Sequence, residues 1–398
     1  MAQTQAPAAV VPFTGAAHVF RRSYYTASAT IDTATHDISP TGNQIFSYGY
    51  LRAHLTRVTT TTAASAGGTL SADDVWGFIG NVQVRQPGGQ QMFGSTNMSG
   101  FLAYLANKQS AWKYISDPAM LPSFTSATTN PAFTLREVFE LNSQTGVGSL
   151  PNQNDAAAWQ LEMSSAANTT AYTTAPTTTN PTLSFKHYVE CWTVPSPQNP
   201  LRPNVQQMTA PPLLGTLNKW TVQQVVVPGG SSFDVPMVRK GNSLRNLGVI
   251  AFNSSNARIA NASAFPSPMS VEWDGTLINS KDDPVLWVDD EYMVRGGAAS
   301  SASASRQTAD TGVIWLKQSA PAGIDISGVG LDGLGMSRQW GTTVTSNITI
   351  GGTWGATVTY VQLLTNDVQY VIPAPNPYAA ASGQPQFQTA IQPSGIGG

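Results

Sequence analysis

Alternation of apolar and polar residues with a period of two is the strongest pattern in this 398-residue sequence. The alternating segments are rich in Val, Ile, Thr and aromatic residues and are bounded by Gly, Pro, Asn or Ser: 50–59, 182–194, 313–317, 343–350 and 357–364. Side chains of a β-strand point alternately to opposite faces, so this pattern predicts half-buried strands. We therefore expect an all-β protein.

Helical patterns are few and short, and the best of them cover residues 98–108, 134–141 and 284–293. Ser99 is a suitable N-cap for the first segment, and Pro284 suits the first helical position of the last. These segments predict short helices inserted in the connections between strands.

Two parts of the chain repeat the same order of elements. In the first part, residues 82–85 read as a strand that leads into a Pro-Gly-Gly turn and then into the helix at 98–108. In the second part, residues 271–273 lead into the Asp274-Gly275 turn and then into the helix at 284–293. Further strands correspond in the same order: 51–59 with 246–252, and 183–194 with 358–372. The pattern predicts two diverged β units of about 170 residues each.

The predicted division of the chain follows from its composition. Residues 1–17 and 368–398 carry no charged side chain, and such segments bury too little apolar surface to fold alone. The proline-rich stretch 195–215 is the predicted joint between the units. Low-complexity loops are expected to project from the ends of the sheets at 61–68, 168–181 and 301–312. The predicted parts are an N-terminal arm (1–45), a first unit (46–205), a second unit (206–372) and a C-terminal arm (373–398).

Charged residues make up 11% of the sequence, whereas a soluble globular protein carries about 25%. With a net charge of −2 and no basic blocks, the sequence provides no positively charged surface for the phosphates of nucleic acid. Sequence-specific binding to nucleic acid is therefore not expected. Cys191 is the only cysteine, which excludes an intrachain disulfide and favours a small buried apolar side chain. The N-terminal stretch is a poor signal peptide, and no apolar run is long enough to span a membrane. We expect synthesis in the cytoplasm.

Residue patterns that would carry catalysis or bind a cofactor or a metal are weak. The Gly-x-Gly-x-x-Gly pattern at 328–333 does not open a helix, and no Gly-x-Ser-x-Gly elbow is present. The histidines are scattered without metal-ligand spacing: His18, His36, His54 and His187. We predict no catalytic, cofactor-binding or metal site.

The acidic residues leave one alternative open. Asp282, Asp283 and the acids at 289–291 could supply one carboxylate of a glycosidase pair, with Glu272 or Asp274 as the other. Acids in the first turn of a helix are, however, favoured by the helix dipole alone. A secreted β-sandwich that binds carbohydrate or hydrolyses glycosides is therefore the alternative to a structural protein.

One basic and aromatic segment stands just inside the predicted N-terminal arm. Arginines beside aromatic rings can contact lipid headgroups or phosphates. A solvated or subunit-paired segment would have the same composition. The candidate membrane- or neighbour-facing residues of this arm are Phe20, Arg21, Arg22, Tyr24 and Tyr25.

This order of elements resembles the double-jelly-roll major capsid proteins, and is similar in particular to coat proteins of tailless, internal-membrane bacteriophages of the tectivirus kind. The resemblance extends over 45–372 and is carried by residues 51–62, 80–108, 246–254 and 312–317. A coat protein of the tailed-phage fold would show a long amphipathic spine helix, and the sequence has none.

The resemblance implies two consecutive jelly-roll β-sandwiches and a homotrimer whose six jelly rolls form a pseudo-hexagonal capsomer. Such trimers would tile an icosahedral shell over a lipid vesicle that encloses double-stranded DNA. The N-terminal arm would lie near the viral inner membrane, and the C-terminal arm would reach neighbouring trimers. Vertex and minor capsid proteins would be further partners, the virion would be the location, and no enzymatic activity or cofactor is implied.

Overall fold

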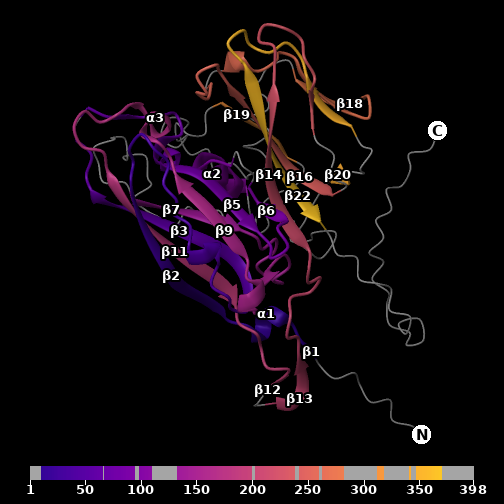
Figure 1. Ribbon diagram of the computed structural model, residues 1–398. Coiled ribbons are helices and arrows are strands. Elements are labelled where there is room, and N and C mark those ends of the chain that lie inside the picture. Colours follow the sequence, from indigo (N-terminus) through magenta and orange to yellow (C-terminus); the bar gives the residue numbers. More distant parts are fainter. Residues whose placement is uncertain are drawn as a thin grey trace, which may run out of the picture.

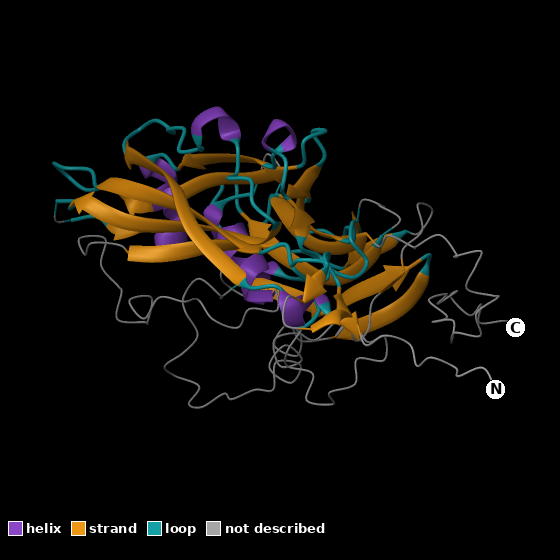
Figure 2. Cartoon of the chain, turned by 90° about the horizontal axis from the view of Figure 1, so that it is seen from below, coloured by secondary structure: helices purple, strands orange, loops and turns teal. Residues whose placement is uncertain are grey.

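The computed structural model describes residues 10–65, 67–94, 98–109, 132–199, 202–237, 242–259, 262–281, 312–317, 340–341 and 347–369. Strands dominate these residues and the helices are short, so the predicted all-β class is confirmed (Figure 2). Three predicted features lie outside the described residues: the helix at 284–293, the glycine pattern at 328–333 and the C-terminal arm at 373–398.

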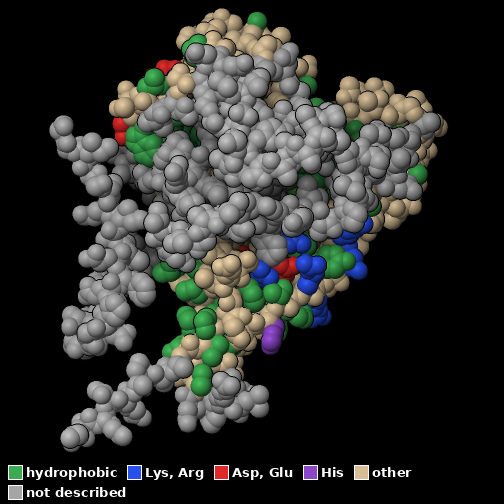
Figure 3. Space-filling view, turned by 180° about the vertical axis from the view of Figure 1, so that it is seen from behind, with side chains coloured by type: hydrophobic (Ala, Val, Ile, Leu, Met, Phe, Trp, Pro, Cys, Tyr) green, Lys and Arg blue, Asp and Glu red, His purple; other side chains and the backbone are tan. Residues whose placement is uncertain are grey.

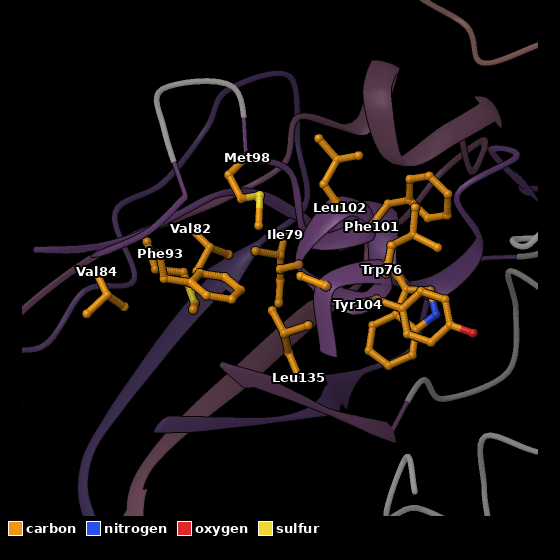
Figure 4. Packing of buried hydrophobic residues seen from close by; sticks show 14 of the residues in the cluster. Trp76, Ile79, Val82, Val84, Phe93, Met98, Phe101, Leu102, Tyr104 and Leu135 are labelled. Atoms are coloured by element: carbon orange, nitrogen blue, oxygen red, sulfur yellow. The ribbon is translucent and has the colours of Figure 1, made fainter. Parts of the chain in front are cut away.

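Two sheets form the first β unit. One is antiparallel, in the order β2 (Val19–Thr30), β11 (Thr182–Trp192), β3 (Tyr50–Thr62) and β7 (Ala132–Val138), with β8 (Leu150–Pro151) also paired to β3. The facing strands are β6 (Gln91–Phe93), β5 (Ile79–Arg85) and β9 (Gln160–Ser165). Apolar side chains fill the space between the sheets, and Figure 4 shows Ile79, Val82 and Leu135 packed with rings from α2 (Gly100–Gln109).

The second unit repeats this arrangement (Figure 1). Its first sheet runs in the order β14 (Leu217–Val226), β22 (Tyr360–Gln369), β16 (Ser243–Phe252) and β19 (Val313–Lys317), with β20 (Trp340–Gly341) also paired to β16. Its other sheet runs in the order β15 (Val235–Pro236), β21 (Ile348–Gly351), β17 (Met269–Trp273) and β18 (Thr276–Lys281). In both units the first long strand pairs with the last, and the last pairs with the second.

The predicted repeat is therefore visible in the strand pairing. β3 and β11 of the first unit correspond to β16 and β22 of the second, as the sequence comparison of the two halves predicted. The Asp274-Gly275 turn is present, with φ of 50° and 77°, which is the positive-φ pair of a type I′ hairpin. In the second unit this turn leads directly into another strand, β18.

One predicted helix is wrong. Residues 134–141 fall largely in strand β7, which pairs with β3 along its whole length. Phe133 and Leu135 point into the core, while Thr134 and Arg136 lie on the other face. Pairing with an adjacent strand has overridden the helical spacing of the apolar residues in this segment.

The helix predicted at 98–108 is confirmed as α2. Its N-cap is Ser99, as predicted, because the Leu102 amide donates a hydrogen bond of 3.3 Å to Ser99 Oγ. All α2 side chains from Phe101 to Ala106 are buried, so the helix is a core element of the first unit.

The region predicted to be an N-terminal arm contains regular structure that belongs to the body of the protein. β1 (Val10–Val11) and α1 (Phe13–Ala16) precede β2, which is the edge strand of the first sheet. A bulge in β2 opposite His187 and Tyr188 interrupts its alternation of side chains, which hid the strand in the sequence. Residues 19–30 therefore lie in the sheet.

The predicted joint at 195–215 forms a small sheet near the base of the molecule (Figure 1). Its strands are β12 (Gln198–Asn199) and β13 (Arg202–Gln207), and β1 pairs in parallel with β13. The remaining short elements are η1 (Thr41–Asn43), β4 (Thr69–Leu70), η2 (Asp74–Phe78), η4 (Asp155–Ala157), α3 (Asn168–Ala171), β10 (Tyr172–Thr174) and η5 (Ala262–Ala264). β4 pairs with β10, which brings the predicted loops at 61–68 and 168–181 together.

Candidate functional site

The two β units meet through a shared apolar core. Side chains of the second unit belong to the core cluster of the first, among them Trp220, Ile250 and Trp315. β14 also pairs in parallel with β6, where Trp220 lies opposite Phe93, so an eight-stranded sheet crosses the boundary between the units. Burial of large aromatic side chains on this scale makes the junction a strong contact.

Polar contacts at the same junction are also buried. Arg258 of the second unit donates from Nε to Asp73 Oδ1 of the first at 3.0 Å, and its guanidinium lies 4.5 Å from the centre of the Phe101 ring. Burial raises the pKa of the Asp73 carboxyl, and Arg258 opposes that rise. A second contact is an asparagine ladder, in which Asn366 donates to Asn218 Oδ1 at 2.6 Å and Asn218 donates to the Val138 carbonyl at 3.4 Å.

The N-terminal segment is fixed to the base of the first unit, which is the end at which β2 and β3 begin and β11 ends. Phe13 packs edge-on against Tyr50 and Trp192, with ring centroids 5.4 and 5.9 Å apart. The Tyr50 hydroxyl donates to the Thr209 carbonyl of the joint at 3.1 Å. The N-terminal segment, the first sheet and the joint therefore hold one another in place.

Exposed apolar side chains are concentrated at this base. Val19, Tyr48 and Val194 are 48%, 38% and 48% exposed, and the Phe20 ring lies 4.5 Å from that of Tyr48. We call these four residues the base patch; Val10 of the nearby small sheet is also exposed. Figure 3 shows hydrophobic side chains gathered at this end, next to a band of Lys and Arg. Exposed apolar groups in one place are typical of an interaction surface.

The structure places the five residues of the candidate arm in β2. Phe20 belongs to the base patch, Arg21 donates from Nε to Glu190 at 3.0 Å, and the Arg22 guanidinium lies 4.6 Å from the centre of the Phe46 ring. Tyr24 and Tyr25 instead turn towards His187, with ring centroids 6.3 and 5.8 Å away. These residues are thus part of a paired strand rather than a projecting segment, and their contact with a membrane or a neighbour stays a prediction.

A buried network of charges lies beside the base and was missed in the sequence. Arg52 donates from Nε to Glu140 Oε2 at 2.8 Å and lies 3.4 Å from Glu190 Oε1. Trp192 donates to Glu140 Oε1 at 2.6 Å, and its ring lies 4.4 Å from the Arg52 guanidinium. Burial raises the pKa of the Glu140 carboxyl, and Arg52 opposes that rise. The signal in the sequence is a charged residue between two apolar neighbours in each of two strands, Arg52 in β3 and Glu190 in β11.

Two of the scattered histidines come together between the sheets of the first unit. His54 and His187 have ring centroids 5.4 Å apart, and His54 Nδ1 lies 2.7 Å from Glu137 Oε2. Among the residues that the structure describes, no three His, Cys, Asp or Glu side chains could together hold a metal ion.

The acidic residues weighed for glycoside hydrolysis are only partly described. Asp274 accepts a hydrogen bond of 2.6 Å from the Asn347 amide and so stabilises the hairpin. Glu272 lies in β17, and the acids from 282 to 291 lie outside the described residues. Cys191 is fully buried, as predicted, and burial raises the pKa of its thiol to about 12. No helix in the described ranges is long and apolar enough to cross a membrane.

Comparison with known proteins identifies the fold. No protein-family model and no curated protein sequence matches the chain. Among solved structures, the major capsid protein of Sulfolobus turreted icosahedral virus matches with a TM-score of 0.54 and 11% identity, over 92% of this chain and 99% of that one. The capsid of PBCV-1 virus matches with a TM-score of 0.54 and 10% identity, over 88% of this chain and 94% of that one. The chain therefore has the double-jelly-roll fold of viral major capsid proteins, and its two β units are jelly rolls.

Proposed function

We propose that this chain is a major capsid protein that assembles as pseudo-hexameric homotrimers into an icosahedral shell. The observation that carries the proposal is the extent of the structural likeness, which covers 92% of this chain and 99% of the matched capsid protein. The likeness therefore includes both jelly rolls in tandem, not a single sandwich of the kind that many unrelated proteins contain. We divide the chain as the sequence indicates, with jelly rolls at 46–205 and 206–372 and β2 added to the first.

The role we propose is structural and not enzymatic. The buried carboxylates of the first jelly roll that could take part in acid–base chemistry are engaged by Arg52 or His54. The scarcity of charge also suits a repeated lattice, because like charges that face each other across identical contacts would repel. Hydroxyl and amide side chains can hydrogen-bond across such contacts without that repulsion.

The finer parts of the proposal concern partners. The shell would enclose an internal membrane and double-stranded DNA, as in tectivirus-like bacteriophages, and the base of the first jelly roll would face that membrane. The base patch supplies apolar and aromatic groups, and Arg22 beside it supplies a cation for lipid phosphate. The C-terminal arm at 373–398 would contact neighbouring trimers, and vertex and minor capsid proteins would complete a virion assembled in the host cytoplasm.

Flotation with vesicles tests the membrane contact. The triple variant Val19→Ser, Phe20→Ser, Val194→Ser is expected to bind vesicles of anionic phospholipid at least tenfold more weakly than the unchanged protein, because it loses apolar surface that would enter the interface. The matched control is Val226→Ser with Leu277→Ser, which removes two exposed apolar side chains of the second jelly roll. Equal flotation of all three proteins would remove the membrane from the proposal.

A further inference from the structure

Four titratable side chains form a cluster inside the first jelly roll: Tyr24, His54, Glu137 and His187, which we call the proton cluster. His54, Glu137 and His187 have no exposed surface. Three polar atoms of the cluster are buried without a hydrogen-bond partner, namely Tyr24 Oη, His54 Nε2 and Glu137 Oε1. Buried polar atoms are normally paired, and each unpaired one destabilises the folded state. A core that needed only apolar packing would not contain this arrangement.

Hydrogen bonding fixes the proton position on His187. Its Nε2 lies 2.9 Å from the carbonyl oxygen of Ile38, which can only accept, so Nε2 carries the hydrogen. Nδ1 of the neutral ring then accepts from the Thr56 hydroxyl at 3.3 Å. A second proton would have to enter at Nδ1, where the hydrogen bond would reverse so that the Thr56 hydroxyl accepts, and where a charge would lie beside the His54 ring.

His54 and Glu137 are joined by a short hydrogen bond, with 2.7 Å between Nδ1 and Oε2. The neutral His54 ring donates this bond from Nδ1 when Glu137 is ionised, and the carboxyl group donates it when Glu137 is protonated. Around the two histidines, the facing groups are Glu137 on β7, with Arg136 on the opposite face of that strand, and Tyr24 and Tyr25 on β2. A second positive charge in this space would therefore share a single carboxylate.

The pKa values follow from burial. Burial lowers the pKa of His54 and of His187 to about 3, His54 adding to the shift of His187, and it raises the pKa of Glu137 to about 8. The folded cluster then holds one proton from pH 3 to 8. In an unfolded chain the ordinary pKa is 6.5 for each histidine and 4.5 for Glu137. The three groups then hold no proton above pH 6.5, two between pH 4.5 and 6.5, when both histidines are protonated, and three below pH 4.5.

The sign of the pH dependence follows from these counts. Below pH 6.5 the unfolded chain holds more protons than the folded one, so stability falls as the pH falls. Between pH 6.5 and 8 the folded chain holds more, so stability falls as the pH rises. The cluster thus gives the first jelly roll its greatest stability near pH 6.5. The second jelly roll has no histidine, since all four lie before residue 206.

We propose that the proton cluster makes the first jelly roll sensitive to acid: entry of a second proton separates the sheets of the first jelly roll before the second jelly roll unfolds. Release of subunits from a shell at low pH rests on the proposed function, whereas the loosening of the first jelly roll is a property of the isolated chain. Its test does not depend on whether the chain forms a capsid.

Urea unfolding of the purified chain between pH 4 and 8, followed by hydrogen exchange, is the experiment. The ratio of unfolded to folded first jelly roll should rise about tenfold for each pH unit from 6.5 to 4.5, and about a hundredfold per unit below 4.5. Amides of β3 and β11 should become exposed in acid before those of β16 and β22. Simultaneous exposure of all four strands, or earlier exposure of β16 and β22, would overturn the proposal.

His187→Gln is the informative variant. The glutamine amide can still donate to the Ile38 carbonyl, and the variant should lose the slope between pH 4.5 and 6.5, where the unfolded chain and the folded pair would hold equal numbers of protons. His36→Gln is the control, because His36 is 39% exposed and pairs with Asp32 near the surface. If the first variant does not fold, histidine titration by NMR decides: His187 of the unchanged protein should remain neutral down to pH 4, and a midpoint near 6.5 would contradict the account.

Discussion

Replacing Arg52 with methionine is expected to lower the free energy of unfolding by about 3–5 kcal/mol, measured by urea unfolding at pH 7. The change leaves Glu140 and Glu190 in sites from which water is excluded, with their shared cation removed. Removing one partner of a buried ion pair is costly because the remaining charge has lost both water and its counter-ion. Burial already raises the pKa of Glu140, and the loss of Arg52, which opposes that rise, would raise this pKa further.

A matched triple variant separates the loss of charge balance from the loss of packing. Arg52→Met with Glu140→Gln and Glu190→Gln removes the uncompensated charges and should recover most of the lost stability. Arg21, which pairs with Glu190, is 54% exposed on its side chain and can be solvated instead. A cost below about 1 kcal/mol for the single variant, or no recovery in the triple variant, would show that the network is not balanced as described.

Replacing Trp220 with alanine is expected to cost about 3–5 kcal/mol and to destabilise both jelly rolls together. Trp220 belongs to the second jelly roll by sequence, but it is fully buried in the core cluster of the first. Calorimetry should show both unfolding transitions at lower temperature, because the shared core links them.

The control for this result is Trp354→Ala. Trp354 is equally buried, but its neighbours all belong to the second jelly roll. Its loss should be confined to the second jelly roll, as measured by hydrogen exchange of β16 and β22 against β3 and β11. If Trp220→Ala left exchange in the first jelly roll unchanged, the two jelly rolls would not be coupled through their shared core.

Local chemistry explains which elements could be predicted. β11 alternates without interruption over most of its length, α2 has a serine cap, and the Asp274-Gly275 turn has the residues that a type I′ hairpin requires. The repeat was detectable because β3 and β11 have counterparts in β16 and β22. The alternation, the cap and the turn are each set by residues close together in the sequence.

Features set by distant residues could not be predicted. β7 has helical spacing of apolar residues and became a strand only because β3 lies beside it. β2 could not be recognised because a bulge in its pairing with β11 interrupts the alternation of its side chains. The site is also set by distant residues, because the pairing of β3 with β11 places His54 and His187 in contact although they are far apart in the sequence.

Some of the few charged residues of this chain are buried. Only 11% of residues are charged, and several of these are buried in the networks of Arg52, Glu137 and Arg258. The charges of these networks do not face solvent, so they add nothing to the few charges that the sequence can place on the outer surface. Such a surface suits contacts that repeat identically between copies of one chain.

Sedimentation velocity of the purified chain tests whether the protein assembles as a capsid protein does. We expect a homotrimer, with a mass three times the 42.1 kDa of one chain. Three protomers with two jelly rolls each are needed for a six-sided capsomer, so the trimer is the building unit and should persist on dilution. A monomer of 42.1 kDa at every concentration and pH would contradict the proposal that this double jelly roll builds a capsid.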